Sequence, residues 1–117
     1  MKETAQKYHR ERRGNCAQSV AFSWGSKNLG GRGVEEVFSG YGGGRAPGGL
    51  CGAVFAACEL AGPVAAEAIK QAFAEKNGGL LTCREIRAAG KLSCNECVGL
   101  AAELLGQHAG KGGKHGE

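Results

Sequence analysis

The sequence predicts an all-α fold, a compact bundle of about five short helices joined by glycine-rich turns. Apolar residues recur at spacings of three and four, and no segment alternates apolar and polar residues as a strand would. The 22 glycines and many alanines favour small, closely packed helices over a core of large side chains. We therefore expect one helical domain over residues 1–105 and a disordered tail rich in Gly, Lys and His over residues 106–117.

Two helices are expected before the long glycine loop. Residues 3–13 are polar enough to form a short exposed helix, and Gly14 ends it. Asn15 is a favourable N-cap for a second helix, which begins at Cys16 and extends to Gly25. The apolar face of this second helix consists of Ala17, Val20, Ala21 and Trp24.

Glycine and proline divide the middle of the chain into short elements. The predicted elements are a turn over residues 28–33, a helical turn over 34–38, a glycine loop over 40–49 and helices over 51–61 and 63–76. Gly62 suits the end of one helix, and Pro63 suits the first turn of the next. The glycine loop leads directly to Cys51, which we expect to be presented at a helix start.

Two capping boxes predict the last two helices. Thr82 and Glu85 have the spacing at which an N-cap hydroxyl and a carboxylate satisfy each other's backbone N–H groups, and Ser93 and Glu96 repeat it. The final helix has an apolar face of Val98, Ala101, Ala102, Leu104 and Leu105.

The composition narrows the classes of function. The net charge is +4, but the basic residues gather at the two ends, as is typical of solvated termini, so we expect no nucleic-acid partner. No apolar run resembles a signal peptide or reaches the length of a membrane span, so we expect no membrane association and a cytoplasmic location. Six cysteines in a reducing compartment indicate metal binding or redox chemistry rather than permanent disulfides.

Four of the six cysteines, Cys16, Cys51, Cys83 and Cys94, fall at or within one residue of a predicted helix start. Unpaired N–H groups and the positive end of the helix dipole favour a thiolate there, so we expect a lowered pKa and one shared site. Cys58 lies about 10 Å along its helix from Cys51 and is expected to be a core residue. His9, His108 and His115 lie in polar segments and are not expected to be ligands.

Cys97 is a further candidate because it forms a Cys-x-x-Cys pair with Cys94. This pair occurs in dithiol oxidoreductases and in metal sites alike. Val98 stands where covalent haem attachment would require His, so covalent haem is not expected. Since Cys94 lies closer to the helix start, we expect it to be the ligand and Cys97 to titrate at higher pH.

The chain resembles the C_GCAxxG_C_C family, redox-active proteins named for their cysteine pattern. The matching segments are residues 15–20, 40–44, 50–54, 83–86, Cys94, Val98 and 101–105. The resemblance implies a small helical redox domain with Cys16, Cys51, Cys83 and Cys94 as its cysteines. A similar domain occurs in a haem protein in which cysteines hold an iron–sulfur centre. Cys58 and Cys97 lie outside the pattern, and Ala56 replaces an expected glycine.

Three functions follow from these observations. The first is electron transfer through an iron–sulfur cluster held by thiolates at helix N-termini, as a component of an oxidoreductase with a redox partner protein. The second is thiol–disulfide exchange, in which Cys94 attacks and Cys97 resolves. The third is a structural zinc site. The modest core of a chain of 117 residues also makes a homodimer a reasonable expectation.

Overall fold

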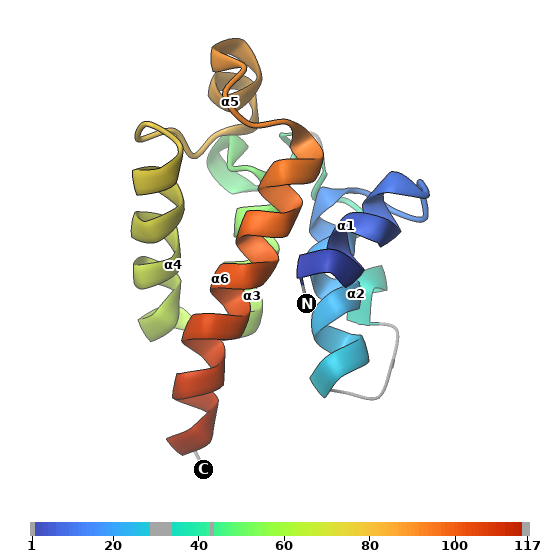
Figure 1. Ribbon diagram of the computed structural model, residues 1–117, viewed down its shortest axis with the longest axis vertical. Helices are drawn as coiled ribbons and strands as arrows, with labels where there is room; N and C mark the ends of the chain where they lie inside the picture. The colour runs from blue at the N-terminus through green and yellow to red at the C-terminus, as the bar shows by residue number, and fades with distance from the viewer. Residues whose placement is uncertain (1, 29–33, 43, 116–117) are drawn as a thin grey trace.

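The computed structural model describes residues 2–28, 34–42 and 44–115, and these residues form an all-α fold (Figure 1). The described segments contain the α-helices α1 (Lys2–Arg10), α2 (Cys16–Asn28), α3 (Gly52–Ala61), α4 (Pro63–Lys76), α5 (Cys83–Ala89) and α6 (Cys94–His115), and the short 3₁₀ helices η1 (Val34–Phe38) and η2 (Pro47–Gly49). The all-α prediction is confirmed, with six α-helices in these segments rather than about five.

Helix α3 lies at the centre of the fold. It packs against α2, α4 and α6, and its residues Ala53, Val54, Ala56 and Ala57 are fully buried. A helix that is apolar on all sides must be surrounded, and small side chains let three neighbours approach it closely. The neighbouring helices supply larger buried side chains, Ile69 and Phe73 from α4 and Leu105 from α6.

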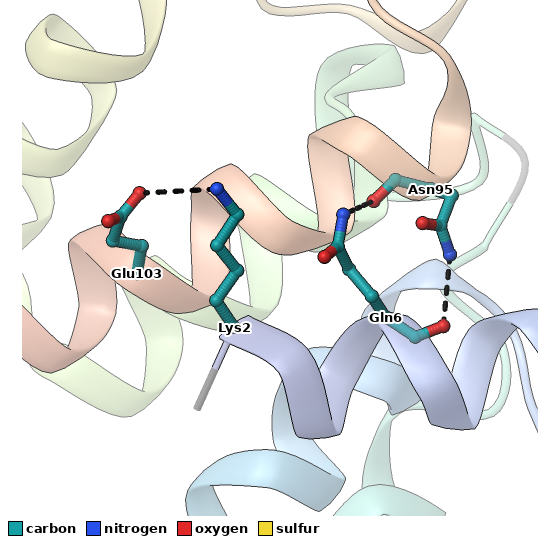
Figure 2. A network of polar contacts seen from close by, with 4 residues as sticks. All are labelled: Lys2, Gln6, Asn95 and Glu103. Atoms are coloured by element: carbon teal, nitrogen blue, oxygen red, sulfur yellow. Dashed lines mark hydrogen bonds and ion pairs between the residues drawn. The ribbon is translucent and has the colours of Figure 1, made fainter.

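Helix α1 packs against α6 and α2 instead of standing in solvent. Figure 2 shows two hydrogen bonds between α1 and α6: Gln6 Nε2 donates to Asn95 O at 3.3 Å, and Asn95 Nδ2 donates to Gln6 O at 3.0 Å. An ion pair of 4.0 Å joins Lys2 to Glu103 further along the two helices. Gly99 permits this approach, because a Cβ there would lie 2.6 Å from Gln6 Nε2.

Several predicted boundaries differ from the structure. Helix α1 ends at Arg10 rather than at residue 13, and α2 continues to Asn28 rather than ending at Gly25. Helix α6 continues to His115, whereas residues 106–117 were expected to be a disordered tail. No proline interrupts residues 106–115, and extending an existing helix costs far less than starting one. Of the predicted turn over residues 28–33, residues 29–33 lie outside the part of the chain that the structure describes.

Helix α5 stands at one end of the molecule, beyond the bundle that the longer helices form (Figure 1). Helix α6 starts beside α5 and runs toward the opposite end. The backbone also joins the start of α3 to the segment before α5, since Cys51 N donates to Leu81 O at 2.8 Å and Leu50 and Thr82 form an isolated antiparallel bridge. Helix starts are therefore brought together at one end of the fold.

Candidate functional site

Each of the four cysteines singled out by the sequence occupies a helix start, as predicted. Cys16, Cys83 and Cys94 are the first residues of α2, α5 and α6, and Cys51 is the N-cap of α3. All six cysteines are in the thiol form. The site is therefore built from helix ends, where backbone N–H groups lack partners within their own helix.

Capping side chains define three of these helix starts. Asn15 Oδ1 accepts from Gln18 N at 2.7 Å while Gln18 Oε1 accepts from Asn15 N at 3.0 Å, which closes a capping box ahead of Cys16. The predicted box at Ser93 and Glu96 has both of its hydrogen bonds, at 3.1 and 2.7 Å. At α5, Thr82 Oγ1 accepts from Glu85 N at 3.3 Å.

Asn15 also holds the segment that precedes the glycine loop against the start of α2. Its Nδ2 donates to Ser39 O at 2.9 Å and to Phe38 O at 3.3 Å. Gly42 packs on the same side chain so closely that a Cβ there would lie 2.5 Å from Asn15 Cβ. The loop therefore reaches Cys51 along a path that passes the start of Cys16's helix.

Glycine also allows α2 and α3 to meet at their first turns. A Cβ at Gly52 would lie 2.7 Å from Cys16 Sγ and 2.5 Å from Tyr41 O. Because neither distance is compatible with a side chain, Gly52 is the residue that lets Cys16 approach Cys51. On the other side of the loop, a Cβ at Gly44 would lie 3.6 Å from Cys83 Cβ, so the loop touches the start of α5 as well.

The thiols interact with one another across these helix starts. The pKa of Cys94 is raised, first by a hydrogen bond with the Cys16 thiol, then by burial, and then by the charges of Cys16, Cys51 and Cys83. The pKa of Cys51 is also raised, first by a hydrogen bond with Cys97 and then by burial. The structure therefore brings Cys16, Cys51, Cys94 and Cys97 together, with Cys83 close enough for its charge to act on Cys94.

The expectation of lowered pKa values is wrong for two of these thiols. The pKa values of Cys51 and Cys94 are raised rather than lowered, first because a hydrogen bond with a neighbouring thiol favours the neutral form, then because of burial, and least because of the charges of nearby sulfurs. The sulfurs are not arranged as a preformed set of metal ligands. Among the described residues, no three His, Cys, Asp or Glu side chains are placed to hold one metal ion. The thiols converge, but a metal or cluster would have to draw them into its own geometry.

The remaining two cysteines, Cys58 and Cys97, have different surroundings. Cys97 is 2% exposed and belongs to the thiol group through Cys51. Cys58 lies in the middle of α3, where its thiol donates to Ala66 O at 3.6 Å, and burial raises its pKa to about 11. Cys58 is a buried residue as predicted, whereas Cys97 lies at the site.

Sequence reasoning missed His9. It was assigned to a solvated segment, yet it is half-buried, with Nε2 at 3.5 Å from Cys94 Sγ and Nδ1 at 3.1 Å from Asn95 Nδ2. Burial lowers the pKa of His9. Nothing local to residues 3–13 signals this contact, because it depends on the packing of α1 against α6.

A hollow of about 560 Å³ opens beside the site on the α5 side. It is lined by Gly44, Gly48, Gly49, Thr82, Cys83, Arg84 and Arg87. Cys83 is only partly buried, and both arginine side chains are exposed. This hollow is therefore a route by which a small molecule can reach one thiol of the group.

No helix in the described segments is both long and apolar enough to cross a membrane. No family model, curated protein or solved structure matches the chain.

Proposed function

We propose that this chain is a small redox protein in which Cys16, Cys51, Cys83 and Cys94 hold an iron–sulfur cluster for electron transfer. The observation that carries the proposal is the thiol group itself, in which Cys94 interacts with Cys16, Cys51 and Cys83 from three other helix starts. A cysteine that only fills the core does not need to lie at a helix start. Cys58 is such a residue, since it is buried in the middle of its helix. The resemblance to the C_GCAxxG_C_C family points to the same four residues.

The donor set suits an iron–sulfur cluster in its chemistry. Thiolates are soft, strongly donating ligands, and clusters are held mainly by cysteine thiolates. The partial positive charge of the helix-end N–H groups would stabilise the negative charge that several thiolates and a cluster bring together. When bound, the cluster would supply one-electron redox chemistry. The protein would contribute four thiolates, a loop backbone beside them and partial exclusion of water.

A second candidate function is thiol–disulfide exchange. The observation in its favour is that thiols already meet in pairs, Cys16 with Cys94 and Cys51 with Cys97. Joining either pair as a disulfide would release two electrons and two protons to an oxidant such as a disulfide substrate. These contacts differ from the Cys94–Cys97 pair that the Cys-x-x-Cys spacing suggests. A structural zinc site is the third candidate, and it requires four donors around one ion.

The proposal includes the setting in which the protein acts. A one-electron carrier requires a redox partner protein, and thiols maintained in reduced form suit a cytoplasmic location. The chain would then serve as a component of an oxidoreductase rather than as a complete enzyme.

The direct test is to purify the protein without oxygen, reconstitute it with iron and sulfide, and measure both elements per chain. We expect a brown protein whose visible absorption disappears on Cys51→Ala substitution. Cys58→Ala is the matched control, because it makes the same change in the same helix at a cysteine outside the thiol group. It should keep the full iron and sulfide content.

Two results would reject the cluster, and a third would reject the thiol group as its binding site. A colourless protein that binds no iron, but forms a Cys16–Cys94 or Cys51–Cys97 disulfide on mild oxidation, would establish the exchange function instead. One zinc ion per chain without bound sulfide would establish the structural site. Equal loss of iron in the Cys51→Ala and Cys58→Ala proteins would show that the thiol group is not the binding site.

A further inference from the structure

The orientation of His9 at the thiol site follows from its hydrogen-bond partners. Its Nε2 lies 3.5 Å from Cys94 Sγ, and its Nδ1 lies 3.1 Å from Asn95 Nδ2. A neutral imidazole carries its proton on one of the two nitrogens. If the proton is on Nε2, the ring donates to the sulfur. If it is on Nδ1, Nε2 presents a lone pair and could bind a metal beside Cys94.

Asn95 decides between these two states. Its Nδ2 lies 3.0 Å from the backbone carbonyl oxygen of Gln6, which can only accept a hydrogen bond (Figure 2). The atom facing Gln6 O is therefore the amide nitrogen, and an amide nitrogen only donates. The same NH₂ group faces His9 Nδ1, so Nδ1 must accept. The single proton of the neutral ring is left on Nε2, facing the sulfur.

We infer that Asn95 holds His9 as the Nε2-protonated tautomer, so that His9 donates a hydrogen bond to the Cys94 sulfur and is not a metal ligand. A doubly protonated ring would direct its Nδ1 proton at the Asn95 NH₂ group, so the same contact requires the neutral ring. Residues 6, 9, 94 and 95 then form one unit, in which the docking of α1 on α6 places an N–H group at a sulfur of the thiol site.

The donated hydrogen bond would tune the sulfur that receives it. An N–H group directed at sulfur favours the thiolate over the thiol in the metal-free protein. For a bound cluster, hydrogen bonds to ligand sulfurs are one of the terms that set the potential. The second effect rests on the proposed function, whereas the tautomer and its effect on the thiol do not. His9 is accordingly a positioning residue for Cys94.

The tautomer can be measured directly in the reduced, metal-free full chain by long-range ¹H–¹⁵N NMR of the histidine rings. We expect His9 to show the Nε2–H pattern, and an Nδ1–H pattern would overturn the inference. Asn95→Asp replaces the donor with an acceptor and should move the proton to Nδ1. If the tautomer stays on Nε2 in that variant, Asn95 does not control it. Gln6→Met, which removes the hydrogen bond from the Gln6 side chain to Asn95 O, is the matched control and should leave the tautomer unchanged.

A second measurement distinguishes a hydrogen bond donated by His9 to Cys94 from a role of His9 in packing alone. With the hydrogen bond removed, the reaction of Cys94 with iodoacetamide at neutral pH should slow roughly fivefold, because a hydrogen bond to a charged group stabilises the thiolate. His9→Phe should show this loss, while His9→Gln retains an amide N–H and should recover most of the rate. If His9 only holds α1 in place, His9→Phe would loosen the packing of α1 beside the Cys94 sulfur and speed the reaction. Peptide-resolved mass spectrometry distinguishes Cys94 from the half-buried Cys83.

Neither measurement requires a metal. A protein that shows the Nε2–H tautomer but binds no iron would support the tautomer inference and reject the cluster. A protein that binds iron but shows the Nδ1–H tautomer would support the cluster and reject the inference.

Discussion

At the scale of single residues, the six cysteines differ by what surrounds them rather than by their sequence neighbours alone. Cys94 is exposed at a helix start, and Cys97 is buried one turn deeper against Cys51. Cys58 is held in the core, with its thiol directed at a backbone carbonyl. The thiol chemistry of the protein is therefore expected to reside in five of its cysteines, and the sixth contributes to stability.

Cys58 is expected to make unfolding depend on pH in the alkaline range. Its pKa is raised from 9.0 to about 11 in the folded state, mainly by burial. The folded state therefore holds this proton longer than the unfolded chain, so the stabilisation is complete below pH 9 and is lost as the pH rises toward 11. Between pH 9 and 11, we expect the free energy of unfolding to fall by about 1–2 kcal/mol more in the native chain than in the Cys58→Ala variant.

Urea unfolding at several pH values, under a reductant, measures this difference. The raised pKa values of Cys51 and Cys94 act in both proteins and cancel in the comparison. Parallel pH profiles for the native chain and Cys58→Ala would contradict the expected role. At neutral pH the variant should be less stable by about 1 kcal/mol, as is usual for a small buried side chain.

Cys94 and Cys97 are expected to differ in their effect on the cluster. Cys94→Ser should lose most of the bound iron and sulfide, since it removes the thiolate at the start of α6. Cys97→Ser should keep most of the cofactor, because its hydroxyl can still contact Cys51 without taking a ligand away. Iron and sulfide analysis of both anaerobically prepared variants measures this difference. Equal loss of cofactor in the two variants would contradict it.

The same pair tests the version of the exchange function in which Cys94 and Cys97 react together. If Cys97 were the resolving thiol, Cys97→Ser would trap a mixed disulfide on Cys94 and turnover would stop. Mass spectrometry of the variant after exposure to a disulfide substrate detects that adduct.

At the scale of elements, the site depends on how closely helix starts approach one another. The α2–α3 approach rests on Gly52, and the approach of the loop to α2 rests on Asn15 and Gly42. The α5 start is held by backbone pairing with the segment before α3. These contacts involve small residues and main-chain atoms, which leave little room for adjustment.

Gly52→Ala is expected to destabilise the fold and to displace Cys16. The new Cβ would lie 2.5 Å from Tyr41 O and 2.7 Å from Cys16 Sγ, so the two helix starts must separate. Overpacking of this kind typically costs about 1–3 kcal/mol. Gly40→Ala is the matched control, because no neighbouring atom lies within 4 Å of its added Cβ.

Urea unfolding gives the two stability changes, and iron analysis of the reconstituted proteins gives the effect on the site. A Gly52→Ala protein as stable as Gly40→Ala, with full cofactor content, would show that the approach of α2 to α3 is not needed.

At the scale of the whole molecule, the thiol group lies at the end of the bundle marked by α5, and the hollow beside Cys83 opens there. Arg84 and Arg87 line this hollow, and the chain carries a net charge of +4. Charge around an opening raises the local concentration of ions of the opposite sign. Reagents that approach Cys83 through the hollow should therefore react faster when they are anionic.

We expect the double substitution of Arg84→Gln and Arg87→Gln to slow the reaction of Cys83 with a dianionic aromatic disulfide about three- to tenfold at low salt. The rate with neutral dithiodipyridine should hardly change. Lys2→Gln with Lys27→Gln is the matched control, because those residues line a different hollow, next to α6. Stopped-flow rates, with mass spectrometry to identify Cys83, measure the ratio. An equal effect on both reagents would show that the arginines act on the thiol and not on the approach.

The sequence by itself determined the helical class, the helix starts and the four cysteines placed at them. These features were predictable because they depend on residues close in the chain. Asn15 and Gln18, or Ser93 and Glu96, form their capping hydrogen bonds over a separation of three residues. Glycine and proline at positions 62 and 63 likewise act on the backbone next to them.

Only the tertiary structure decided which thiols meet, which way their pKa values move, and that His9 belongs to the site. The contact of His9 with Cys94 joins residues 85 positions apart, and it exists only because α1 packs along α6. Helix-end effects act on each cysteine alone and predicted lowered pKa values. Hydrogen bonds between thiols of different helices and burial by packing reverse that direction, because both arise only in the assembled site and not in a single helix.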